Sequence, residues 1–133
     1  FYISNNIKIA LQLGINGVYI PSFNKKLNYS NIYNKPKKFK IIGSAHNINE
    51  INLKKIQGCN EIFLSSIFKV KKSKKFLGIV KFNLFKLSRK ENLIPLGGIK
   101  LSNLNKLSIV NSNAFALMSE IKKKPTNFIS RLF

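Results

Sequence analysis

Short apolar runs rich in β-branched residues alternate with amphipathic stretches along the chain, at intervals of about 20 to 25 residues. Each run has the length of a β-strand. Six strands are expected, over Phe1–Ser4, Gly17–Pro21, Phe39–Ser44, Glu61–Phe68, Leu93–Leu96 and Ala114–Met118. The run Glu61–Phe68 is apolar almost throughout, which indicates a strand that is covered on both faces. The alternation is typical of βα units that build a parallel sheet.

Helical patterns fill the intervals between these strands. They cover Ile7–Gly14, Asn47–Gln57 and Ile79–Leu87, with a short helix near Lys26–Tyr33 and further helices from Ser102 and from Pro125. Asn47 and Glu50 have the spacing of a capping box, and Gly14 suits a helix end. Because similar units repeat without a long crossover, the order favours a partial (β/α) TIM-type barrel over an open doubly wound sheet. Residues 1–133 are expected to form a single domain.

The formal net charge of +20 comes from 24 basic and 4 acidic residues, and it first suggests nucleic acid or an anionic membrane surface as a partner. All basic residues except Arg89 and Arg131 are lysines, and they accompany abundant Asn and Ile, as in proteins encoded by AT-rich codons. Arginine is the side chain that pairs bidentately with phosphate and guanine, and no aromatic-rich strand is available to stack bases. The lysine runs fall in predicted loops. We therefore expect no specific nucleic-acid partner, with salt-sensitive nonspecific binding as the alternative.

The sequence gives little indication of a membrane-spanning segment or of disulfide bonds. No apolar run approaches the roughly 18 residues that cross a bilayer, so no membrane partner is expected. The single cysteine, Cys59, cannot form an internal disulfide and gives no metal-ligand spacing. A reducing cytoplasmic location is the simplest expectation. The chain starts at Phe1 without an initiator methionine, and we expect further residues upstream.

The segment from Ile94 to Ile99 carries the most informative chemical pattern. Gly97 and Gly98 directly follow an apolar strand, where glycines let backbone N–H groups approach an anion closely. Ser119, at the end of the next expected strand, adds a hydroxyl group. Together these residues predict a phosphate site at the carboxyl ends of two neighbouring strands. A tight turn that binds no ligand is the alternative.

An ordered series of motifs extends this pattern over nearly the whole chain. The series comprises Ile3–Asn6 with Asn16–Ile20, then Ile41–His46, Ile62–Phe68, Pro95–Ile99 and Ala116–Ser119. In residues and spacing it resembles the thiamine phosphate synthase/TenI family. The resemblance implies a (β/α) barrel of which residues 1–133 supply about the third to eighth strands, without the first two βα units. Upstream strands or a second copy in a homo-oligomer would then cover the open edges.

The resemblance also implies a function in thiamine biosynthesis. Synthases of the family join an aminopyrimidine diphosphate to a thiazole phosphate, and the TenI branch isomerises the thiazole precursor. Gly97, Gly98 and Ser119 match the positions that bind the thiazole phosphate, and Ser44 matches a serine near the pyrimidine. Lys74, or the next lysine in a shifted register, matches a catalytic lysine that contacts phosphate. The implied partners are therefore small phosphorylated thiazole and pyrimidine ligands.

Two further matches concern catalysis and metal binding. His46 matches a histidine that serves tautomerases as general acid and base, since imidazole exchanges protons near neutral pH. A hydrogen-bonded structural histidine is the alternative. The two aspartates that hold Mg²⁺ in the synthases are matched by Asn5 and Asn24, in a chain without any aspartate. Because uncharged amides hold this hard cation poorly, three functions stay open: a weakened synthase, a tautomerase that uses His46, and a non-catalytic phosphate-binding barrel.

Overall fold

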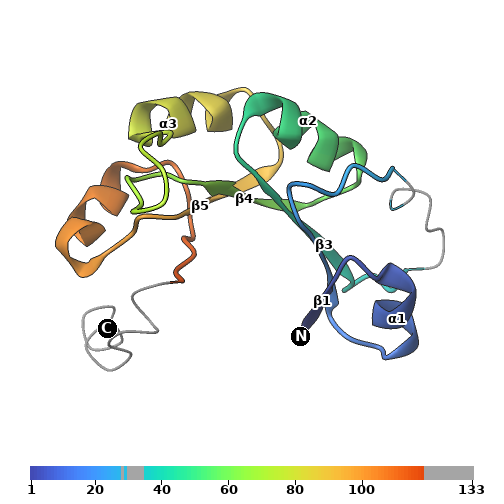
Figure 1. The fold of residues 1–133 in the computed structure, drawn as a ribbon. Helices are drawn as coiled ribbons and strands as arrows, with labels where there is room; N and C mark the ends of the chain where they lie inside the picture. The colour runs from blue at the N-terminus through green and yellow to red at the C-terminus, as the bar shows by residue number, and fades with distance from the viewer. Residues whose placement is uncertain (28, 30–34, 119–133) are drawn as a thin grey trace.

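The computed structural model describes residues 1–27, 29 and 35–118. These residues form an α/β fold around one sheet of five strands, in which all neighbouring strands are parallel. The strands lie across the sheet in chain order as β1 (Tyr2–Ser4), β2 (Gly17–Ile20), β3 (Lys40–Ala45), β4 (Glu61–Ser65) and β5 (Asn92–Leu96). An order without reversal is that of a (β/α) barrel, and it confirms the predicted fold class. The sheet curves as a barrel wall does, but it does not close (Figure 1).

The helices lie mainly on the convex side of this wall. They are α1 (Ile7–Gln12), α2 (Ile48–Ile56), α3 (Ile79–Leu87) and the 3₁₀ helix η1 (Leu101–Ile109). Figure 1 shows α2 and α3 above β3 to β5, whereas the concave side of these strands carries no helix of the described residues. Half of the predicted capping box forms at the start of α2, where Asn47 Oδ1 accepts the Glu50 N–H at 3.0 Å. The Glu50 carboxylate accepts the backbone N–H of His46 rather than that of Asn47. No helix within the described residues is long and apolar enough to span a bilayer.

The hydrophobic core lies between the convex face of the sheet and these helices. Alternate strand residues point into it, and Val18, Ile62 and Leu64 are fully buried there. Ile51 of α2 and Phe82 of α3 pack against them from the other layer. Burial of each such side chain contributes about 1.5–3 kcal/mol. Apolar residues recur every second position in the strands and about every 3.6 positions in the helices, so this gain is obtained when the two apolar faces pack against each other.

Two predicted strands differ from the observed ones. Strand β4 ends at Ser65 rather than Phe68, and its burial alternates, so it is not covered on both faces as predicted. Ile67 is buried because it packs in the loop after the strand, where its N–H donates to the Leu96 carbonyl at 3.0 Å. The expected sixth strand pairs only as an isolated bridge between Ala116 and Leu96 within the described residues.

Two predicted helices fall wholly or partly on residues outside the described ranges. The helix from Pro125 lies entirely outside them. In the segment predicted as a short helix, Lys26 and Leu27 are described and are not helical. The helix expected from Ser102 is present, although it takes the tighter 3₁₀ form as η1.

A buried lysine holds the loop after β2 against α2. Lys54 is fully buried, and its ammonium group donates to the carbonyl oxygens of Pro21 at 2.7 Å and Asn24 at 3.0 Å, and to Gln57 Oε1 at 2.8 Å. The Gln57 amide donates in turn to the carbonyls of Asn24 and Lys26, at 2.9 and 2.7 Å. Burial lowers the pKa of Lys54, and the three acceptors compensate for the water that the ammonium has lost.

The space around this lysine is tightly filled. A Cβ placed on Gly43 of β3 would lie 2.8 Å from both Cys59 Sγ and Lys54 Cδ. Cys59 is buried, and burial raises the pKa of its thiol to about 11 although Lys54 opposes the shift. The thiol is therefore protonated at neutral pH and serves as a small packing group, not as a nucleophile.

Candidate functional site

The candidate residues that the structure describes lie at or just after the carboxyl ends of the strands. Asn5 follows β1, Asn24 lies in the loop after β2, His46 follows β3, and Gly97 with Gly98 follows β5. Parallel strands bring these ends to one rim of the sheet, which is where (β/α) barrels bind their ligands. Ser119 lies outside the described residues.

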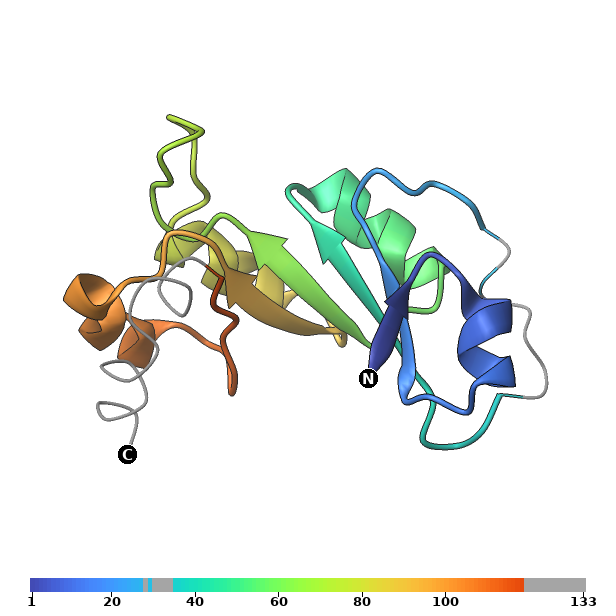
Figure 2. The same ribbon diagram turned by 60° about the horizontal axis from the view of Figure 1, so that its bottom comes forward.

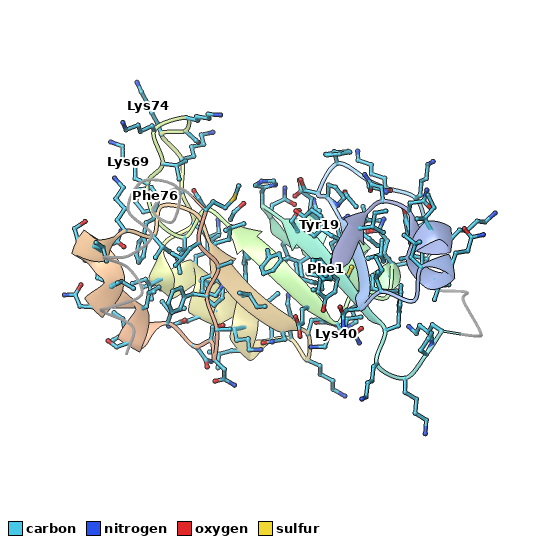
Figure 3. The ribbon with its side chains drawn as sticks, turned by 90° about the horizontal axis from the view of Figure 1, so that it is seen from below. Phe1, Tyr19, Lys40, Lys69, Lys74 and Phe76 are labelled. Atoms are coloured by element: carbon cyan, nitrogen blue, oxygen red, sulfur yellow. The ribbon has the colours of Figure 1, made fainter. Side chains whose placement is uncertain are left out.

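A cleft of about 790 Å³ opens at this rim beside the loop that joins β4 to α3. Figure 2 shows this loop projecting beyond the strand ends, and Figure 3 places Lys69, Lys74 and Phe76 on it, apart from Tyr19 and Lys40. The lining includes His46, Ser65, Ser66, Lys74, Lys75, Gly97 and Met118. The structure thus brings three of the predicted residues, His46, Lys74 and Gly97, to one cavity.

The two glycines form a turn directly after β5, and Gly97 lines the cleft. Their φ angles are +91° at Gly97 and +71° at Gly98, values that favour glycine. The Asn103 amide donates to the Gly98 carbonyl at 2.8 Å, which fixes the turn. Within the described residues, the N–H groups of Gly97 and Gly98 donate to no protein acceptor. Two such groups, held next to each other, are the donors that an anion requires.

The loop above the glycines adds positive charge. Its lysines are all exposed, at positions 69, 71, 72, 74 and 75. The ion pairs among described residues use Lys40, His46 and Lys55, so none of the loop lysines has a carboxylate partner there. Lys74 and Lys75 both line the cleft, and either register of the predicted lysine reaches it. The local field therefore favours an anionic ligand.

A carboxylate orients His46 at the cleft edge. Glu50 Oε2 accepts the backbone N–H of His46 at 2.8 Å and lies 3.0 Å from its ring Nδ1. In the neutral tautomer that donates from Nδ1 to Glu50, Nε2 is the acceptor nitrogen, and the imidazole is 56% exposed. The ring is thus hydrogen-bonded, as expected for a structural histidine. It is also open to a ligand, as expected for a catalytic one. The capping residue Glu50 has this second role, which its sequence position did not reveal.

Ser44 lies inside the sheet rather than at the cleft. It is buried on the concave side, where the Tyr19 hydroxyl donates to Ser44 Oγ at 2.9 Å. The Tyr19 ring in turn packs against Phe63, with ring centroids 6.4 Å apart. Ser44 is not among the residues that line the cleft.

Asn5 and Asn24 meet at the far end of the same rim. Asn24 Nδ2 donates to Asn5 Oδ1 at 2.7 Å, beside a small hollow of about 370 Å³ that Tyr29, Lys25 and Lys26 also line. The two positions predicted as degenerate metal ligands are thus adjacent in space, 19 residues apart in sequence. The parallel register that places Ser4 opposite Tyr19 brings them together.

Comparison with known proteins decides the family. The family model described as thiamine monophosphate synthase (TMP-TENI) matches residues 1–121. The chain belongs to the thiamine monophosphate synthase family. This match confirms the resemblance inferred from the motifs. A search of curated protein sequences gives no match.

A solved structure shares the fold of this family member. It is a thiamine phosphate pyrophosphorylase from Pyrococcus furiosus, to which this chain is similar with a TM-score of 0.68 and 15% sequence identity. The similarity covers 92% of this chain and 62% of that one, so the chain spans less than two thirds of the archaeal protein.

The magnesium ion of the family synthases does not fit the residues present here. The atom that faces Asn5 Oδ1 is an amide nitrogen with its hydrogens, which repels a cation. Within the described part of the chain, no group of three or more His, Cys, Asp or Glu side chains is arranged to hold a metal.

Two serines of the cleft had no predicted role. Ser65 and Ser66 line it at the end of β4, but the apolar run Glu61–Phe68 had been interpreted as one continuous strand. Two adjacent hydroxyl residues inside an apolar run were the available signal for a strand end at this position.

Proposed function

We propose that this chain is a thiamine phosphate synthase-like protein whose cleft binds the phosphate group of a thiazole phosphate. The single observation that carries the proposal is the pair of N–H groups at Gly97 and Gly98, which donate to no acceptor within the described residues. They lie beside a loop whose lysines contact none of the described carboxylates. Backbone donors give directional hydrogen bonds, and the lysines supply the compensating charge. Family membership supports the assignment to thiamine biosynthesis.

The backbone and side-chain groups of the cleft would contact the phosphate from different sides. The glycine N–H groups would hold the phosphate at the floor, and Lys74 or Lys75 would neutralise it from the loop above. Ser65 and Ser66 offer hydroxyl groups between these two anchors. With the phosphate fixed, the thiazole ring lies along the rim toward Tyr19 and the hollow beside Asn5, where the pyrimidine partner would approach. Coupling then depends on orientation of the two substrates at one rim.

Loss of the two cleft lysines should weaken phosphate binding. The double variant Lys74→Gln/Lys75→Gln removes two charges, and we expect affinity for thiazole phosphate to fall roughly tenfold, the effect of one charged hydrogen bond. Titration of thiazole phosphate into labelled protein, followed through the amide signals of Gly97 and Gly98, measures the affinity. Inorganic phosphate serves as the comparison ligand.

A matched control fixes the interpretation of that titration. Lys90→Gln makes the same kind of change at an exposed lysine in the turn before β5, at the opposite rim of the sheet. It should leave the affinity within about twofold. Equal losses in the control and in the cleft variant, or no shift at the two glycines, would contradict a phosphate site here.

The Glu50–His46 contact favours a second function, isomerisation of the thiazole precursor. A carboxylate at Nδ1 with Nε2 free is the arrangement of a histidine that transfers protons to a ligand. We expect His46→Gln to lower isomerisation by at least about 100-fold and to leave coupling largely intact. Parallel assays of the two reactions on the same preparation check this. If both activities fall equally, His46 acts on the fold or on binding and not as a proton carrier.

A further inference from the structure

The amides of Asn5 and Asn24 contact each other and neighbouring groups of the protein. Asn24 Nδ2 donates to Asn5 Oδ1 at 2.7 Å and to the Tyr29 hydroxyl at 2.8 Å, while Asn24 Oδ1 accepts the Lys26 N–H at 2.9 Å. The Lys26 contact fixes the orientation of the amide, because a flipped Asn24 would face Lys26 with a donor and Asn5 with a second oxygen. Asn24 therefore presents an N–H donor, and not an oxygen, to Asn5.

The hydroxyl of Tyr29 closes this cluster on its other side. It donates to the Asn5 carbonyl oxygen at 3.2 Å, and Tyr29 is almost completely buried. Strand β1 and the loop after β2 are therefore joined twice, once through the amides and once through the phenol. A bridging cation would join the same two segments, so the cluster makes such an ion unnecessary for holding them together.

Positive charge is already present on the inner side of the same loop. The Lys54 ammonium donates to the carbonyl of Asn24 itself, at 3.0 Å. The carboxylates that the structure describes are used elsewhere: Glu50 contacts His46, Glu61 contacts Lys40, and Glu91 contacts Lys55. A divalent ion at Asn24 would thus meet a fixed charge of the same sign without a carboxylate to offset it.

We propose that the Asn5–Asn24–Tyr29 cluster and the Lys54 ammonium replace the divalent cation at this rim, so that the loop after β2 is fastened without metal. The hollow beside the cluster then presents Lys25 and Lys26 directly to an anionic ligand such as a diphosphate. Lysine ammonium groups of the chain would then neutralise the negative charge of the ligand at this end of the rim. The inference concerns the fold of the rim and can be tested without any substrate.

The first measurement is cation binding by the unaltered chain. Mn²⁺ is a paramagnetic probe of Mg²⁺ sites, and it should not broaden the side-chain amide signals of Asn5 and Asn24 more than those of exposed asparagines. Thermal unfolding in EDTA and in millimolar Mg²⁺ should differ by less than about 1 °C. Selective broadening at Asn5 and Asn24, or a Mg²⁺ stabilisation of several degrees, would overturn the proposal.

Substituted chains test the replacement itself. In Asn5→Asp/Asn24→Asp two carboxylates face each other at hydrogen-bond distance, so the melting temperature in EDTA should fall by roughly 5–10 °C and recover in Mg²⁺. Asn5→Asp alone keeps the Asn24 N–H donor, and it should melt equally in EDTA and Mg²⁺. A cation requirement in this single variant would also count against the proposal, and it remains measurable if the double variant fails to fold.

The control for added charge is Asn49→Asp/Asn105→Asp. Both positions are exposed, on α2 and η1, and the substitution changes the net charge by the same amount. Its melting temperature should respond to Mg²⁺ no more than that of the unaltered chain. Recovery in Mg²⁺ of equal size in the control and in the rim variant would show a general charge effect and contradict a specific replacement of the cation.

Discussion

Replacement of Lys54 by methionine should lower the free energy of unfolding by about 2–4 kcal/mol, even though methionine fills most of the same volume. The ammonium donates to Pro21, Asn24 and Gln57, and its loss leaves buried acceptors without a donor. The Asn24 carbonyl keeps the Gln57 amide, so the loss falls mainly on the other two acceptors. Urea unfolding followed by far-UV circular dichroism measures the effect.

The same substitution at Lys8 is the control. Lys8 is an exposed lysine of α1, and Lys8→Met should change the free energy of unfolding by no more than about 0.5 kcal/mol. If both variants lose equally little stability, the carbonyls around Lys54 are reached by water and the loop after β2 is held by other contacts.

An alanine at Gly98 should cost about 3 kcal/mol or more and should disrupt the predicted phosphate site. The φ angle of +71° is unfavourable for any side chain, and a Cβ would lie 2.5 Å from the Phe68 carbonyl oxygen. Phe68 cannot withdraw freely, because its N–H donates to the Gly97 carbonyl at 3.2 Å. The free energy of unfolding and the thiazole phosphate titration should both report the damage.

Gly14 is the control, because an alanine there would strain the backbone without colliding with any other residue. Its φ angle is +61°, but a Cβ there would have no atom within 4 Å, so Gly14→Ala should cost only about 1 kcal/mol. The difference between the two alanine variants measures the close approach at Gly98. Equal costs would mean that the loop after β4 moves aside readily, and that the glycine turn is not held against it.

The order of elements could be predicted because each strand has a clear apolar period and the units repeat. The end of β4 could not, since Ile67 is as apolar as a strand residue and is buried for another reason, its packing in the loop. The partial loss of the sixth strand has the same origin, because the pattern around Ala116 shows apolar character but not how many hydrogen bonds form. Tertiary context determines both outcomes.

The positions of candidate residues that directly follow a strand, such as Gly97 and His46, could be predicted from the sequence. Contacts between segments were not predictable from residue types. The Asn24 amide meets Asn5 only because of the strand register, and Glu50 serves both as a cap and as a partner of His46. Lys54 is the clearest case: in a chain with 24 basic residues, nothing in the sequence shows that this lysine is buried, whereas the other lysines that the structure describes are at least partly exposed.

The contacts of Lys54 and Gln57 with the loop after β2 span 30 to 33 residues along the chain. Pairings between segments this distant form after helices and local turns, because closure of the intervening chain must come first. Interactions that appear late on the folding pathway act chiefly on the rate of unfolding. We therefore expect loss of the Lys54 contacts to raise the rate of unfolding more than it lowers the rate of folding.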